Sequence, residues 1–215
     1  MTSLFHRFAD FWSVFSSRFG IRSDAGLINS VDNLKNFVTT RSAFIAQKTL
    51  YGYVKTRMGT RYPEMFKDDL IIHSVNIAKM HYFAACLSDL TIYAVAQATV
   101  SLGADDAARR ALAENVYRSA LAENMAESVD EFSPDEAIRE FQTRLSGTDW
   151  SGLALTRDNF TQSPAKLIEW APIAEHLKNM DREIAENSVK FAWADIRRSF
   201  EKRLDADAVA EDLAA

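Results

Sequence analysis

The stretch YFAACLSDLTIYAVAQATVSL, residues 82–102, is the part of the chain that comes nearest to a membrane span. A helix that is apolar on all sides belongs either in a membrane or in the core of a protein. Asp89 and Gln97 argue against a span, since a central aspartate costs about 2.5–3.5 kcal/mol on insertion. The alanines of the stretch also let neighbouring helices approach closely. It therefore predicts the central buried helix of a soluble bundle.

This central helix extends back to about residue 64, because Pro63 prevents a helix from continuing out of Tyr62. Glu64 suits a helix N-terminus and Gly103 suits a helix end. We therefore expect a long helix over about 64–102, with a kink or a break along it left open.

Cap and stop signals predict the other helices. Ser30 or Asn29 begins a helix that Gly59 ends after Met58. Ser133-Pro134 begins another, which ends at Gly147. The rest is a helix over 104–128, a loop over 148–160, a short helix from Ser163-Pro164, and a last helix from Pro172 with apolar positions Ile173, Leu177, Met180, Ile184, Phe191, Ile196 and Phe200.

No stretch alternates apolar and polar residues long enough for a convincing strand, and 7 Gly and 4 Pro are few for a fold with frequent turns. The sequence therefore predicts an all-α protein, an irregular helical bundle of about six or seven helices around the central helix. Its expected organisation is an amphipathic aromatic-rich helix over 1–22, a single bundle domain over 23–205 and an acidic tail over 206–215 that frays.

The N-terminal helix has a very aromatic face, which includes Phe8, Phe11, Trp12 and Phe15. One interpretation is that this face docks on the bundle or on a partner protein. The other is peripheral contact with a membrane, with nearby arginines at anionic headgroups. Docking is preferred, because the polar face is weakly charged for an interfacial helix.

Basic residues concentrate in the first part of the chain. Residues 1–62 contain nine Lys/Arg and three Asp/Glu, a net charge of +6, whereas 101–150 contain five and eleven, a net charge of −6. Such asymmetry indicates a partner for the basic part, or attraction between the two parts.

Three cations of the helix over 31–58 recur every seven residues: Arg41, Lys48 and Lys55, here called the cation row. On a helical wheel they lie within about 40° of Phe37, inside an apolar stripe. The opposite face is Thr39, Ser42, Ala43, Ala46 and Tyr53.

Two interpretations of the cation row are open. In the structural one, the stems pack on apolar neighbours and the heads pair with Asp89, Asp68 or Asp69. In the functional one, the cations line a groove for an anionic ligand, a lipid headgroup or an acidic protein segment. The structural interpretation is preferred because an unpaired buried charge is costly.

The functional interpretation extends the basic surface to Tyr51, Arg57 and Arg61 at the end of the same helix. Cations there also suit the helix dipole, so they are ordinary end-of-helix residues as well. Nucleic acid is a poor fit, because the whole chain has a net charge of −5 and shows no helix-turn-helix signal.

Signatures of catalysis are mostly absent, including the motifs of phosphate-binding loops and zinc peptidases. The spacing of His73 and His81 does not suit a metal site, so no metal and no cofactor is expected. One nucleophile-and-base candidate exists, Ser163 with Lys166, although a serine before a proline ordinarily caps a helix.

Cys86 is the one cysteine, lies in an apolar run and excludes an internal disulfide, so we expect a buried, inert thiol and a reducing compartment. The N-terminus lacks the features of a secretory signal. The sequence thus favours a non-catalytic binding or adaptor protein in the cytoplasm, with peripheral membrane contact left open. Its partner would be a protein or an anionic ligand, a homodimer stays open, and a helical hydrolase using Ser163 and Lys166 is the alternative.

Overall fold

The computed structural model describes residues 26–100, 105–124, 131–156 and 159–214, and within them the protein is an all-α bundle. The helices are listed in chain order: α2 (Val31–Met58), a 3-10 turn η1 (Gly59–Arg61), α3 (Tyr62–Met65), α4 (Asp69–Ala98), α5 (Asp106–Asn124), α6 (Pro134–Ser146), α7 (Trp150–Thr156), α8 (Gln162–Trp170), α9 (Glu175–Arg203) and α10 (Ala206–Ala214). The predicted fold class is therefore confirmed.

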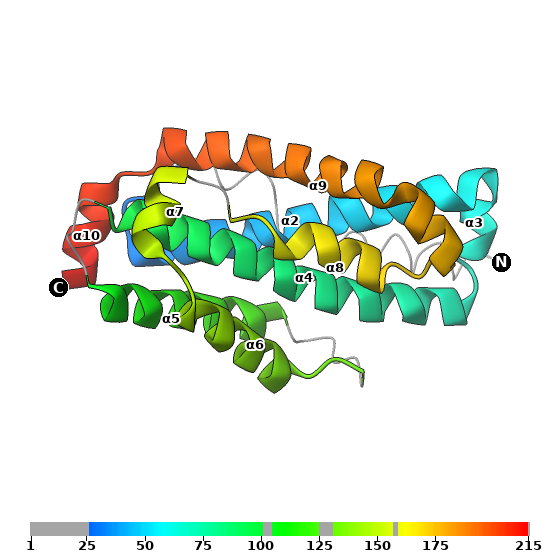
Figure 1. Cartoon of the computed structure of the whole chain (residues 1–215), viewed down its shortest axis with the longest axis horizontal. Coiled ribbons are helices and arrows are strands. Elements are labelled where there is room, and N and C mark those ends of the chain that lie inside the picture. Colours follow the sequence, from blue (N-terminus) through cyan, green and yellow to red (C-terminus); the bar gives the residue numbers. More distant parts are fainter. Residues whose placement is uncertain (1–25, 101–104, 125–130, 157–158, 215) are drawn as a thin grey trace.

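Helix α4 is the centre of the bundle, as predicted, and the other long helices run along it (Figure 1). It packs against α2, α5, α6, α7, α8 and α10, and almost every side chain from Ala78 to Ala96 is buried. By length and composition α4 could cross a membrane, but 56% of its most apolar window is buried inside the bundle. Cys86 lies on this helix and is buried, as expected.

The predicted caps explain where the helices begin and end. Ser30 accepts a hydrogen bond from the backbone N–H of Asn33 at the start of α2, and Gly59, with φ of 58°, ends that helix. Ser133 accepts from the N–H of Glu136 in the same way, and α6 ends at Gly147. The break before α4 falls at Asp68, whose side chain accepts from the N–H of Leu70.

Two expectations about irregular segments were wrong. The stretch 148–160 contains α7, which begins at Trp150, a residue only 1% exposed. The tail over 206–215 contains α10, in which Val209 is fully buried. In both places one or two apolar side chains reach the core, and their burial holds a helix that is too short to be stable alone in water.

Contacts at both ends hold α2 and α9 side by side, although they lie far apart in the sequence (Figure 1). At one end the N–H of Ile28 donates to the carbonyl of Arg203, and Leu204 pairs with Ile28 in an isolated bridge. At the other end Arg57 forms an ion pair with Asp181. Helices α2 and α8 each pack on both α4 and α9.

Candidate functional site

The cation row lies along one side of α2, and its members differ in exposure. Lys48 and Lys55 are exposed and Arg41 is half-buried. Each cation lies over an aromatic ring: Arg41 over Phe37 at 5.8 Å, Lys48 over Phe44 at 5.5 Å and Lys55 over Tyr62 at 4.4 Å from the ring centroid. Such contacts hold a cation in place without neutralising it.

The prediction that Asp89 or Asp68 pairs with the cation row was wrong. Asp89 pairs instead with Arg144, at 2.8 Å, and Asp68 caps α4. The supposed opposite face of α2 is also buried, because small residues there allow α2 to pack closely on α4; the Ser42 hydroxyl lies 3.4 Å from the carbonyl oxygen of Cys86, to which it donates. The buried members of that face are Thr39, Ser42, Ala43 and Ala46.

The other residues predicted for the basic surface have different surroundings. Arg57 is committed to Asp181, which also accepts a hydrogen bond of 3.0 Å from the Tyr53 hydroxyl. Tyr51 stacks on Phe66, with ring centroids 5.9 Å apart. Arg61 is exposed. The predicted docking residues Phe8, Phe11, Trp12 and Phe15 lie outside the described residues.

Ser163 and Lys166 do not come together as a nucleophile and its base. The Ser163 hydroxyl is fully buried, donates to Asp89 at 2.7 Å and accepts from the Trp193 indole N–H at 2.8 Å. Lys166 lies 3.0 Å from a carboxylate oxygen of Glu169. The serine is therefore a structural link between α4, α8 and α9.

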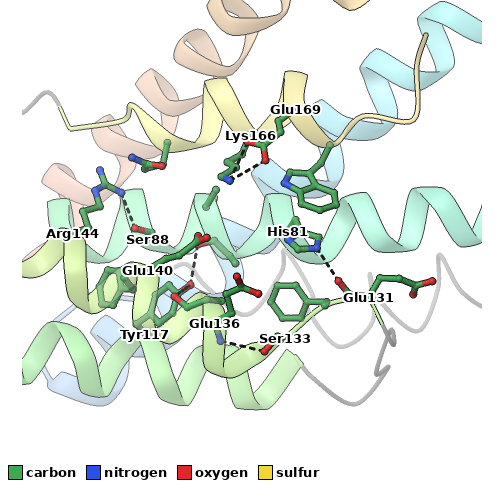
Figure 2. Close-up of a pocket in the computed structure, with 17 residues that line it drawn as sticks. His81, Ser88, Tyr117, Glu131, Ser133, Glu136, Glu140, Arg144, Lys166 and Glu169 are labelled. Carbon is green, nitrogen blue, oxygen red and sulfur yellow. Dashed lines mark hydrogen bonds and ion pairs between the residues drawn. The ribbon is translucent and has the colours of Figure 1, made fainter. Parts of the chain in front are cut away.

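A cavity of about 360 Å³ lies between α4, α6 and α8 (Figure 2). Glu136 and Glu140 enter it from α6, on the side opposite Lys166 and Glu169 of α8. Its volume is in the range of small-molecule sites, which combine apolar walls with a few convergent polar groups. A second cavity, of about 350 Å³, lies beyond Arg144, and neither is lined by the cation row.

Aromatic rings form one end of the first cavity. His81 stacks face to face on Trp170, with centroids 3.4 Å apart, and meets Phe132 edge-on at 5.1 Å. The Nε2 of His81 lies 3.2 Å from the carbonyl oxygen of Glu131, so this nitrogen carries the donated proton. Burial lowers the pKa of His81 below its ordinary value of 6.5, against the opposing effect of that carbonyl, which favours the neutral form of the imidazole.

The charges that line the cavity do not balance. Arg144 is committed to the buried Asp89, and Lys166 is paired with Glu169. The carboxylate of Glu131 bonds the exposed His73 at 2.9 Å. Among the described residues, Glu136 and Glu140 have no cationic partner, and they lie one helical turn apart on the same face of α6. The charged groups of the cavity that have no partner of opposite charge among the described residues are therefore carboxylates.

The described residues contain no group of three His, Cys, Asp or Glu side chains that could hold a metal ion. The cavity was missed by sequence reasoning because α4, α6 and α8 supply its residues from separate parts of the chain. One local signal was available: Glu136 and Glu140 stand next to the apolar positions of a short, well-capped helix. Comparison of the chain with protein-family models, with curated proteins and with solved structures gives no match.

Proposed function

We propose that this protein is a non-catalytic binding protein whose cavity between α4, α6 and α8 takes a small organic cation, such as an amine or guanidinium group. The observation that carries the proposal is the pairing of two uncommitted carboxylates, Glu136 and Glu140, with the aromatic rings of Trp170 and Phe132. Carboxylates supply charge-assisted hydrogen bonds, and ring faces attract a desolvated cation. The neutral His81 adds no opposing charge.

Calorimetric titration with arginine methyl ester, a primary amine and tetramethylammonium, each beside a neutral isostere, tests this proposal. We expect cations to bind and isosteres not to bind. Glu140→Gln is expected to weaken binding about tenfold or more, since a hydrogen bond to a charged group is worth roughly 1.5–3 kcal/mol. Asp135→Asn is the matched control, because Asp135 is exposed on α6 and does not line the cavity. Equal loss in both variants, or no binding by the unmodified protein, would refute it.

A second candidate function is binding of an acidic protein segment at the exposed edge of α2. It is supported by Lys48 and Lys55, which are exposed and, among the described residues, have no carboxylate partner. A bound acidic segment gains charge-assisted contacts at a surface that already faces water, so little desolvation is required. We place such a protein in the cytoplasm, in keeping with its single buried cysteine.

The double variant Lys48→Glu/Lys55→Glu separates this surface from a structural role. We expect it to lose binding to a polyglutamate peptide while its melting temperature stays unchanged. Lys202→Glu, a change of an exposed lysine near the end of α9, is the control. Co-sedimentation with phosphatidylserine vesicles, compared with phosphatidylcholine vesicles, distinguishes a membrane surface from a protein. Retained peptide binding in the double variant would exclude the α2 edge.

A further inference from the structure

The outer face of α9 carries three large apolar side chains that nothing in the described structure covers. Met180, Ile184 and Phe191 are 74%, 75% and 77% exposed. The buried residues of the helix lie on its opposite side: Ala185, Val189, Trp193, Ile196 and Phe200. Because the buried residues of α9 face the core, the exposed face points away from it; α9 itself runs along the upper edge of the molecule in Figure 1. Contiguous exposed apolar side chains of this kind mark an interaction surface.

The spacing of this face is that of a coiled-coil seam. Its positions recur at alternating intervals of three and four residues: Leu177, Met180, Ile184, Asn187, Phe191 and Ala194. Such a heptad pattern packs against another helix by inserting side chains into the gaps between the partner's side chains. At 1.5 Å per residue the seam is about 26 Å long. A second helix with the same pattern fits it, and every copy of this chain has one.

We propose that α9 joins two copies of this chain as an antiparallel, two-fold symmetric helix pair. In this arrangement Met180 lies opposite Phe191 of the second copy, and Ile184 lies opposite Asn187 of the second copy. Each apolar side chain on one helix then meets the same surface on the other, as a two-fold interface requires. The bundle domains lie on the two outer sides of the pair, because each core is on the far side of its own α9.

Two charged residues beside the seam determine the direction of the pair. Glu183 and Lys190 are both exposed, and neither forms an ion pair with another described residue. When Met180 lies opposite Phe191, the antiparallel register places Glu183 opposite Lys190 of the second copy, and symmetry repeats the pair. A parallel register places Glu183 beside Ser188 instead, without an opposite charge. Charge complementarity therefore favours the antiparallel pair.

Sedimentation equilibrium of the full chain over a wide concentration range tests the proposal. We expect reversible dimers, and we expect Ile184→Lys to be monomeric with an unchanged helical circular-dichroism spectrum, because this side chain already faces water. Leu70→Lys is the matched control: Leu70 is 77% exposed on α4, away from the seam, and this variant is expected to dimerise normally.

Charge reversal tests the direction of the pair. Glu183→Lys and Lys190→Glu are each expected to weaken dimerisation about tenfold or more, because like charges then face each other, and the double variant is expected to restore it. A double variant no better than the single ones would overturn the antiparallel register. A chain that stays monomeric at millimolar concentration would overturn the proposal, and dimers formed only after deletion of residues 1–25 would show that the N-terminal segment occupies the face instead.

Discussion

Asp89 joins three helices from the middle of the most apolar one. Its carboxylate is fully buried and accepts from the Arg144 guanidinium, from the backbone N–H groups of Gln162 and Ser163, and from the Ser163 hydroxyl. Burial raises the pKa of Asp89, whereas Arg144 and the Ser163 donors oppose that rise. The carboxylate also caps the N-terminus of α8, where negative charge is favourable.

We therefore expect Asp89→Ala to lower the free energy of unfolding by about 3–5 kcal/mol, since the charge of Arg144 loses its carboxylate partner and the first N–H groups of α8 lose their acceptor. Urea denaturation followed by circular dichroism measures this loss. Glu123→Ala, an exposed change on α5, is the control and should alter stability by less than about 0.5 kcal/mol. An Asp89→Ala protein as stable as the control would contradict the proposed role of this carboxylate.

At the scale of the element, α10 is a short helix that contacts with the rest of the bundle hold in place. Val209 is fully buried against the core, and the Asp212 carboxylate accepts from the N–H of Val31 at the start of α2. Nine residues are too few for a helix that is stable alone in water. The helix therefore depends on these two contacts, and it closes the end of the bundle where α2 begins.

Val209→Ala should lower the free energy of unfolding by about 1.5–3 kcal/mol, because it removes two buried carbons, each worth about 0.8 kcal/mol, and leaves a cavity. Leu213→Ala changes a partly exposed residue of the same helix and should cost well below that. Thermal or urea denaturation of the two variants compares them directly. A smaller loss for Val209→Ala than for Leu213→Ala would mean that α10 does not pack as described.

Helix boundaries could be predicted because capping is local. Ser30, Gly59, Ser133 and Gly147 each carry their signal within one turn of the helix that they begin or end. Which face of a helix is buried could not be predicted for α2, since its small residues pack as well against α4 as its large ones. The burial of the apolar residues of the last helix could not be predicted either: Phe200 packs in the core, whereas Phe191 is exposed.

The candidate site was beyond sequence reasoning for a different reason. The stacking of His81 on Trp170 joins residues 89 positions apart, and no periodicity in one segment reports such a contact. Sequence reasoning had no means of finding the aromatic partners of His81. The row of cations on α2 could be found from the sequence because its seven-residue spacing is local. The ion pair of Arg57 with Asp181 could not be found, because Asp181 belongs to α9.

At the scale of the whole molecule, the surface has three regions that differ in charge and polarity. The α2 edge is basic, the cavity between α4, α6 and α8 is acidic, and the outer face of α9 is apolar. Because α9 faces away from α5 and α6 in Figure 1, pairing of two chains through α9 leaves the cavity open on each copy. Ligand binding in the cavity and self-association through α9 are therefore compatible, and each can be tested with the other intact.

The stability of the whole bundle should depend on pH through His81. Its folded pKa lies below 6.5, so the unfolded chain binds a proton that the folded chain resists. The free energy of unfolding therefore falls as the pH drops through about 6.5, and it levels off below the folded pKa. The variant His81→Gln keeps a donor for the Glu131 carbonyl but cannot be protonated, so its stability should change less between about pH 7 and pH 5.

Urea denaturation at each pH measures how steeply the free energy of unfolding depends on pH, with His176→Gln, a change of an exposed histidine, as the control. Equal slopes in the His81→Gln variant and the unmodified protein would show that protonation of His81 is not coupled to folding.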